Sequence, residues 1–122
     1  MEKNSTGKGN WAEEKAVKFL LKKDYAILER NWRFKKYEVD IIAKDGNTMV
    51  FVEVKSRGSD AFGEPETAVT RKKQRFLVTA ADQYIQANNI QLESRFDIIS
   101  ILVINNNITV KHIEDAFYPS VK

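Results

Sequence analysis

Hydrophobic residues recur along this chain with two periods, one typical of helices and one typical of strands. From Asn10 to about residue 23 the apolar positions follow helical spacing, and Asn10 is a candidate cap. A second helical pattern begins after Thr70, its candidate cap, and runs to about residue 87. Its expected inner face consists of Phe76, Leu77, Ala80, Ala81, Tyr84 and Ile85. The pattern therefore predicts two amphipathic helices.

Five further segments favour strands because they are apolar and rich in β-branched and aromatic residues. They cover residues 26–32, 37–43, 49–54, 96–104 and 108–113. Asp45-Gly46-Asn47 is typical of a hairpin turn, and the polar segment 56–66 is expected to form a loop. The order α-β-β-β-α-β-β predicts an α/β fold of the mixed α+β type, with a central mixed sheet flanked by helices.

Length and composition restrict what such a fold contains. The 122 residues suit one domain, expected over residues 10–122, after a flexible arm at residues 1–9. The absence of cysteine excludes disulfides, thiolate zinc sites and cysteine nucleophiles. No apolar run approaches the roughly 20 residues of a membrane span, and the first residues lack the apolar stretch of a signal peptide. We therefore expect a cytoplasmic protein without a membrane partner.

The net charge of +3 is unevenly distributed. Residues 1–80 carry 17 basic and 12 acidic side chains, whereas residues 81–122 carry 3 and 5. The basic excess is densest at 35–36 and at 71–75, where the cations crowd the start of the second predicted helix. A helix N-terminus disfavours cations and attracts phosphate, so a nucleic-acid backbone would relieve the conflict. An ordinary solvated surface is the alternative, and charge alone does not decide.

The candidate chemistry lies on the predicted hairpin. Alternation places Glu53 and Lys55 on one face of their strand. Two- and four-residue loops both bring Asp40 to the same face as Glu53, with about 4.5–8 Å between Cβ atoms, whereas a three-residue loop separates them. Two carboxylates on apolar strands need a partner. Lys55 would make them a structural ion-pair cluster, and a divalent cation would make them a metal site.

Two other titratable residues bear on this site. At about 100° per residue, Glu13 falls inside the apolar arc of the first helix, whereas Glu14 falls outside it. Glu13 therefore either points toward Asp40 and Glu53 or stabilises the helix N-terminus. His112 is the only histidine, and a lone histidine beside apolar residues is more often packed or capping than catalytic.

Several sequence segments resemble one known family. They are Tyr-Glu-Val-Asp-Ile-Ile (37–42), Val-Phe-Val-Glu-Val-Lys-Ser-Arg (50–57), Arg-Phe-Asp-Ile-Ile (95–99), His-Ile-Glu-Asp-Ala-Phe (112–117), Ala-Glu-Glu-Lys-Ala (12–16), Asn31-Trp32-Arg33 and Phe62-Gly63. Together they resemble the YraN-like family of small bacterial predicted endonucleases, over nearly the whole chain. That family is similar to the PD-(D/E)XK nucleases, with a restriction-endonuclease-like core, and to archaeal Holliday-junction resolvases. Resolvase-like nucleases usually dimerise, so the resemblance also implies a homodimer.

The resemblance implies a role for each matching residue. Asp40, Glu53 and the carbonyl of Val54 would bind Mg²⁺ or Mn²⁺, and Glu13 would support the metal through water. Lys55 would orient or deprotonate the attacking water and stabilise the transition state. The basic residues expected to bind nucleic acid are Lys35, Lys36, Arg57, Arg71, Lys72, Lys73 and Arg75.

The expected function is therefore a Mg²⁺-dependent endonuclease that hydrolyses DNA phosphodiester bonds, with branched or damaged DNA as its target. One alternative is a non-catalytic nucleic-acid-binding module with the same fold. Another is a structural or interaction domain whose acids form salt bridges. Two positions depart from the family pattern, because Tyr37 and Ala12 stand where glycine is usual. The bulkier Tyr37 is expected to narrow access to the site.

Overall fold

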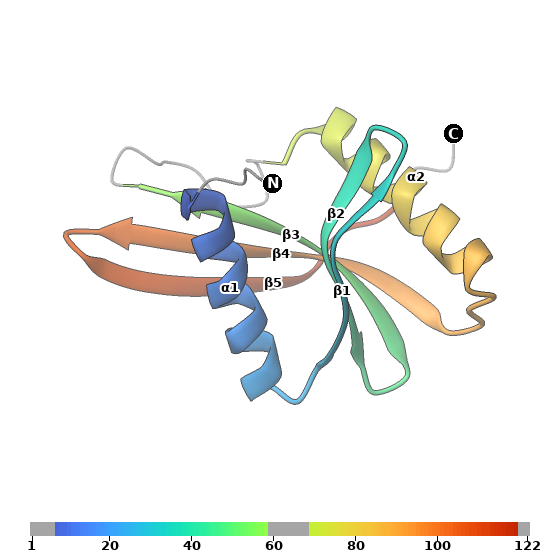
Figure 1. The fold of residues 1–122 in the computed structure, drawn as a ribbon, viewed down its shortest axis with the longest axis horizontal. Helices are drawn as coiled ribbons and strands as arrows, with labels where there is room; N and C mark the ends of the chain where they lie inside the picture. Colours follow the sequence, from blue (N-terminus) through green and yellow to red (C-terminus); the bar gives the residue numbers. More distant parts are fainter. Residues whose placement is uncertain (1–6, 59–68, 120–122) are drawn as a thin grey trace.

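A computed structural model describes residues 7–58 and 69–119 of the chain (Figure 1). The elements are α1 (Gly7–Lys22), β1 (Ala26–Phe34), β2 (Tyr37–Asp45), β3 (Thr48–Arg57), α2 (Arg71–Ala87), β4 (Glu93–Ile104) and β5 (Asn107–Phe117). The predicted order α-β-β-β-α-β-β and the mixed α/β class are confirmed. Neither described helix is long and apolar enough to cross a membrane.

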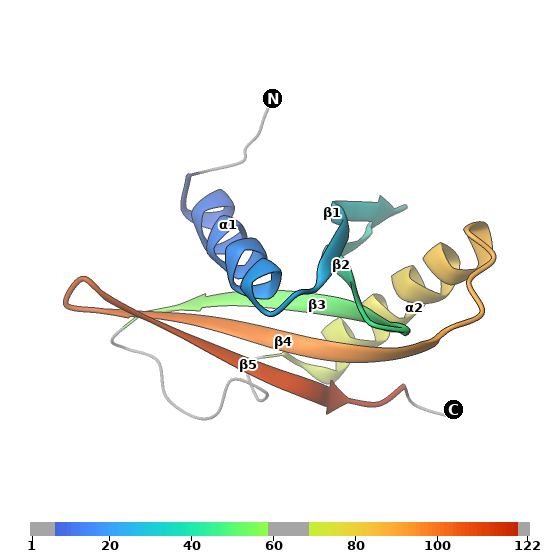
Figure 2. The same cartoon turned by 90° about the horizontal axis from the view of Figure 1, so that it is seen from below.

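The described strands form one five-stranded sheet in the order β1-β2-β3-β4-β5. Neighbouring strands run antiparallel except for the central pair, β3 and β4, which is parallel. A parallel pair needs a crossover connection, and α2 lies within it. The β1–β2 hairpin turns away from the plane of β3, β4 and β5, as Figures 1 and 2 show.

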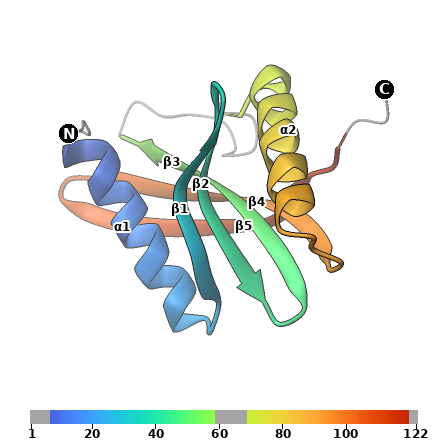
Figure 3. The same cartoon turned by 45° about the vertical axis from the view of Figure 1, so that its right-hand side comes forward.

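Each helix covers a different face of the sheet (Figure 3). On one face α1 packs Ala16 and Leu20 against alternate strand residues such as Val50, Val52 and Ile99. On the other face α2 packs Leu77, Ala80, Ala81 and Tyr84 against residues that include Met49, Phe51 and Ile98. The alternation along β3 therefore separates the two cores as its sequence predicts.

The register of the β2–β3 hairpin matches one of the two predicted alternatives that bring the acids together. Lys44 pairs with Met49 and Asp45 pairs with Thr48, which leaves Gly46-Asn47 as the turn. Gly46 has a φ of +60°, which glycine adopts without strain. The same register, continued beyond the Ile41–Val52 pair, places Asp40 opposite Glu53.

The helix boundaries partly differ from the sequence predictions. Thr70 is the N-cap of α2, and its hydroxyl accepts the Lys73 N–H at 3.1 Å. By contrast α1 begins at Gly7, so Asn10 lies inside the helix rather than at its cap. Of the expected arm, residues 1–6 lie outside the described part of the chain, as do residues 59–68 of the expected loop, with Phe62-Gly63.

One residue of the predicted α2 inner face is misplaced by the sequence pattern. Phe76 and Ile85 are both only half-buried, but Ile85 packs against the core on the α2 side, whereas Phe76 is not among the residues of that core. Phe76 lies at the flank of the helix, where its ring meets that of Tyr37 from the β1–β2 hairpin at a centroid distance of 4.9 Å. The helical period predicts approximately which side of α2 carries Phe76. It cannot predict that the β1–β2 hairpin, rather than the core, lies against that side.

Candidate active site

The candidate site lies where β2 separates from β3. Beyond the Ile41–Val52 pair, the Val54 N–H donates to the Asp40 carboxylate, with 2.8 Å between N and Oδ2, instead of to a backbone carbonyl. The N–H and C=O of one strand residue point to the same strand edge. The Val54 carbonyl therefore points toward the strand edge at which the Asp40 carboxylate lies. This orientation is required if both oxygens are to bind one cation.

Glu53 lies opposite Asp40 on the face that α2 covers. Its side chain is 6% exposed, and Oε2 lies 3.7 Å from Nζ of Lys73 in the first turn of α2. Its other oxygen, Oε1, is buried without a hydrogen-bond partner in the described structure. A single partly exposed ammonium thus satisfies only half of this carboxylate.

Burial and mutual repulsion make these two carboxyl groups reluctant to ionise. Desolvation, followed by the charge of Glu53, raises the pKa of Asp40 to about 7. Desolvation also raises the pKa of Glu53, although the charges of Lys73 and Lys55 and a hydrogen bond with Asp40 oppose the rise. A pair of this kind holds one proton between its members near neutral pH, or binds a cation instead.

Glu13 approaches Asp40 from α1. Glu13 is half-buried, whereas Glu14 is exposed and forms an ion pair with Arg30 at 3.2 Å. Glu13 therefore points inward and Glu14 points outward, as predicted. Burial raises the pKa of Glu13, and a hydrogen bond from Asn31 partly offsets the rise. The charge of Asp40 raises the pKa further, and Oε1 of Glu13 is buried without a hydrogen-bond partner in the described structure. Glu13 therefore contributes to the same electrostatic cluster.

A fourth acid belongs to this cluster and was missed by the sequence reasoning. The charge of Glu38 contributes to the raised pKa values of Glu13, Asp40 and Glu53. Its own partner is Arg33, with 3.2 Å between Oε1 and Nη2. The signal was present in the sequence, because Glu38 precedes Asp40 by two residues and alternation puts both on one strand face.

The cations around the acids are arranged differently from the prediction. Lys55 is half-buried, and its charge favours ionisation of Glu53, but the ion pair with Glu53 is made by Lys73. In the described parts of the chain no three His, Asp or Glu side chains are close enough to hold one metal ion together. Direct binding of a cation would therefore use Asp40, Glu53 and the Val54 carbonyl, with Glu13 acting through water.

The basic residues at the start of α2 that are predicted to bind nucleic acid lie on two sides of the helix. Lys72 and Lys73 lie on the side of α2 that meets the β1–β2 turn, which carries Lys35 and Lys36. On another side of α2, Arg71 and Arg75 line a pocket of about 250 Å³ with Gln74, Val78 and Tyr118. Arg57 is the last residue of β3.

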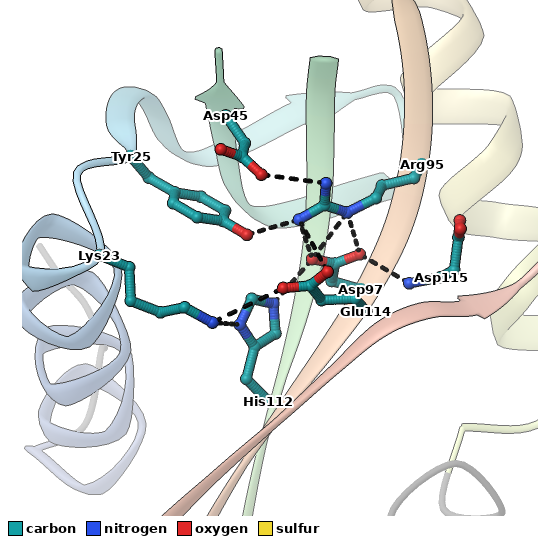
Figure 4. Close-up of polar contacts among 8 residues, drawn as sticks. All are labelled: Lys23, Tyr25, Asp45, Arg95, Asp97, His112, Glu114 and Asp115. Carbon is teal, nitrogen blue, oxygen red and sulfur yellow. Dashed lines mark hydrogen bonds and ion pairs between the residues drawn. The ribbon is translucent and has the colours of Figure 1, made fainter. Parts of the chain in front are cut away.

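His112 lies in a different, structural cluster on the face that α1 covers (Figure 4). Its Nε2 is 2.7 Å from Oδ2 of Asp97, and its Nδ1 is 2.9 Å from Nζ of Lys23. Because a lysine ammonium only donates, Nδ1 accepts and Nε2 carries the hydrogen that Asp97 accepts. This geometry agrees with the prediction that His112 is a packed residue.

Asp97 is the centre of that cluster. Arg95 Nε donates to it at 3.0 Å, and the Asp115 N–H donates at 3.0 Å. Arg95 also donates to the Tyr25 hydroxyl and to Asp45. The cluster thereby connects the start of β1, the β2–β3 hairpin, β4 and β5.

Comparison with known proteins finds a matching family profile and several similar sequences. Residues 12–101 match the sequence profile described as Uncharacterised protein family UPF0102. A UPF0102 protein of Flavobacterium psychrophilum is 46% identical over 110 residues, which cover 90% of this chain and 92% of the relative. One from Caldicellulosiruptor saccharolyticus is 48% identical, covering 89% and 95%. One from Christiangramia forsetii is 44% identical, covering 96% and 97%.

Proposed function

The chain belongs to the uncharacterised protein family UPF0102, the YraN family, and we propose that it is a Mg²⁺- or Mn²⁺-dependent endonuclease acting on DNA. The observation that carries this proposal is the facing pair of Asp40 and Glu53, in which Glu53 Oε1 is buried and has no hydrogen-bond partner among residues 7–58 and 69–119. Hard divalent cations bind such carboxylate oxygens together with backbone carbonyls and water.

An ion-pair cluster explains the same residues less well. Four acids, Glu13, Glu38, Asp40 and Glu53, repel one another electrostatically, and the Glu53 charge is compensated mainly by Lys73. Breaking or omitting a partner of a buried charge is costly, so a purely structural cluster would be expected to satisfy every buried oxygen. Instead, one oxygen of Glu13 and one of Glu53 lack a hydrogen-bond partner within the described part of the chain.

The proposed reaction is hydrolysis of a phosphodiester. Water adds to the phosphorus, the bond from phosphorus to one sugar oxygen breaks, and the products carry a phosphate and a hydroxyl. A bound divalent cation would supply Lewis-acid stabilisation of the developing charge and a more acidic water. Lys55 is the chain's candidate for orienting the water and stabilising the transition state, and Glu13 would position water beside Asp40. Lys35, Lys36, Lys72 and Lys73 supply positive charge for the phosphate backbone.

The direct test is cleavage of linear, flap and four-way DNA in the presence of Mn²⁺, with EDTA as the matched control. We expect cutting with Mn²⁺ and none with EDTA. Binding of all three DNAs without any cutting would instead support the non-catalytic nucleic-acid-binding module. Absence of both binding and cutting would leave the structural domain as the better explanation.

Metal binding gives a second expected result that does not depend on activity. At pH 8, Mn²⁺ at about one hundred times its dissociation constant should raise the free energy of unfolding by about 2.7 kcal/mol. Thermal unfolding monitored by circular dichroism measures this shift. Glu53→Gln should abolish it, whereas Asp82→Asn, which changes an exposed acid on α2, should retain it. An equal shift in both variants would contradict the assignment of Glu53 as a ligand.

A further inference from the structure

Aromatic rings and lysines interleave where the tip of the β1–β2 hairpin meets the start of α2. We name this the hairpin–helix surface, and it consists of Phe34, Lys35, Lys36, Tyr37, Lys72 and Phe76. The rings of Tyr37 and Phe76 lie 4.9 Å apart at 60°. Lys36 Nζ is 5.7 Å from the first ring centroid and 5.5 Å from the second. Figures 1 and 3 show the hairpin tip beside the first turns of the helix.

The rings lie at the edge of the core on the α2 side, against which Tyr37 packs. Phe34, Tyr37 and Phe76 are all half-buried, so each keeps solvent-accessible area. Lys72 Nζ lies 5.8 Å from the Phe76 centroid, and Lys35 Nζ lies 5.4 Å from that of Phe34. Flexible lysines therefore lie over the ring surfaces that core packing leaves accessible.

The hairpin–helix surface is continuous with the candidate active site. Tyr37 begins β2, and alternation turns its ring to the opposite strand face from Glu38 and Asp40, toward the α2-side core, so the connection to the acids runs through α2. Phe76 follows Lys73 by three residues on α2, which places the two side chains on neighbouring positions of one helix side. Lys73 itself reaches Glu53 at 3.7 Å. A strand held at the acids would therefore extend over these rings.

We propose that the hairpin–helix surface binds unpaired nucleobases by stacking, so that the substrate presents a single-stranded or splayed segment beside the cleaved phosphate. This inference rests on the proposed nucleic-acid function. A base would stack on Phe76 and Tyr37, and Lys36 and Lys72 would move from the rings to the flanking phosphates. Each lysine exchanges a weak cation–π contact for an ion pair with phosphate.

Unpaired bases fit this surface better than a duplex. The faces of paired bases are covered by their neighbours in the stack, so a protein ring reaches them only when they are splayed out. Aromatic rings combined with basic side chains are typical of single-strand binding, where stacking contributes about 1–3 kcal/mol per base. A duplex backbone would require the lysines but would make no use of the rings.

The test compares the affinities of variants for a single-stranded oligonucleotide and a blunt duplex, by fluorescence anisotropy with EDTA present. Phe76→Leu should weaken single-strand binding roughly tenfold and leave duplex binding unchanged. Phe76→Tyr keeps the ring and should bind like the wild type. Trp11→Leu is the matched control, because Trp11 is 36% exposed and has Lys15 Nζ 5.9 Å from a ring centroid, but lies on α1. It should leave both affinities unchanged.

Salt dependence separates stacking from charge. Lys36→Gln should reduce the slope of log affinity against log salt by about 0.7 on the single strand. Phe76→Leu should lower the affinity without changing that slope. Equal losses on single strand and duplex, unchanged binding of Phe76→Leu, or the same loss in Trp11→Leu would overturn the inference.

The outcomes also distinguish this inference from the proposed function. Normal binding of Phe76→Leu by a protein that cleaves DNA with Mn²⁺ would overturn the stacking surface alone. Failure of the wild type to bind any DNA would overturn the proposed function and the stacking surface together.

Discussion

Replacing Asp40 by Asn is expected to lower metal-dependent DNA cleavage by about a thousandfold and, without metal, to make the protein more stable. The loss follows because a neutral amide is a much weaker ligand for a hard cation than a carboxylate. Cleavage rates with Mn²⁺ measure the first effect, and urea denaturation with EDTA measures the second.

The gain in stability follows from the raised pKa of Asp40. The pKa of Asp40 is about 7 in the folded chain, whereas the ordinary value, taken for the unfolded chain, is 3.8. The folded state therefore binds this proton more tightly than the unfolded state does. Ionised Asp40 therefore costs free energy above pH 7, and the cost disappears as the pH falls toward 3.8. Because Asp40 is partly exposed, we expect Asp40→Asn to gain about 2 kcal/mol at pH 8 and almost nothing at pH 4. The amide oxygen can still accept the Val54 N–H.

Asp82→Asn serves as the control for both measurements, since it removes an exposed acid outside the site. It should change neither cleavage nor stability appreciably. Undiminished cutting by Asp40→Asn would put the active site elsewhere. A loss of stability together with activity would mean that Asp40 has a structural role instead.

The second large effect concerns Asp97, whose replacement by Ala should lower the free energy of unfolding by about 3–5 kcal/mol. Its side chain has no exposed surface, and it accepts hydrogen bonds from Arg95, His112 and the Asp115 N–H. Removing the carboxylate leaves the largely buried Arg95 guanidinium without its main partner. Chemical denaturation at neutral pH measures the difference.

The pH dependence of this effect has the opposite sign to that of Asp40. Burial opposes ionisation of Asp97, but the hydrogen bonds from His112, Arg95 and Asp115 outweigh it and lower the pKa below 3.8. The contribution of ionised Asp97 to the free energy of unfolding is therefore complete above pH 3.8. It is lost as the pH falls through the folded-state pKa of Asp97. The difference between wild type and Asp97→Ala should narrow in acid.

Glu114→Gln is the matched control, because it removes a second acid from the same arginine. Glu114 Oε1 lies 3.8 Å from Arg95, and its side chain is 52% exposed. An exposed ion pair contributes less than about 1 kcal/mol, so this variant should remain close to wild type. Equal losses in both variants would contradict the central role of Asp97.

The sequence predicted those parts of the site that depend on a local period. Alternation with a period of two brings Asp40 to the same face as Glu53 for a loop of two or four residues, and the observed register places them opposite each other. The helical period similarly predicts that Glu13 lies on the inner side of α1 and Glu14 on the outer side. These are relations within one helix or one hairpin, so they do not depend on the rest of the fold.

Contacts between distant elements could not be predicted in this way. The ion pair of Lys73 with Glu53 depends on where α2 crosses the sheet, and the position of Phe76 depends on the hairpin tip. The cluster around Asp97 joins residues that lie 50 to 70 positions from Arg95 in the chain. Periodicity contains no information about such distances.

The parallel pairing of β3 with β4 has a consequence for the order in which the molecule folds. Val50 pairs with Arg95 across this junction, so a long loop must close before the central strands meet. The β2–β3 hairpin needs no such closure and can form within microseconds. Asp40 and Glu53 should therefore meet early in folding, as a local pair, and Lys73 should join them only when α2 docks in the slow final stage.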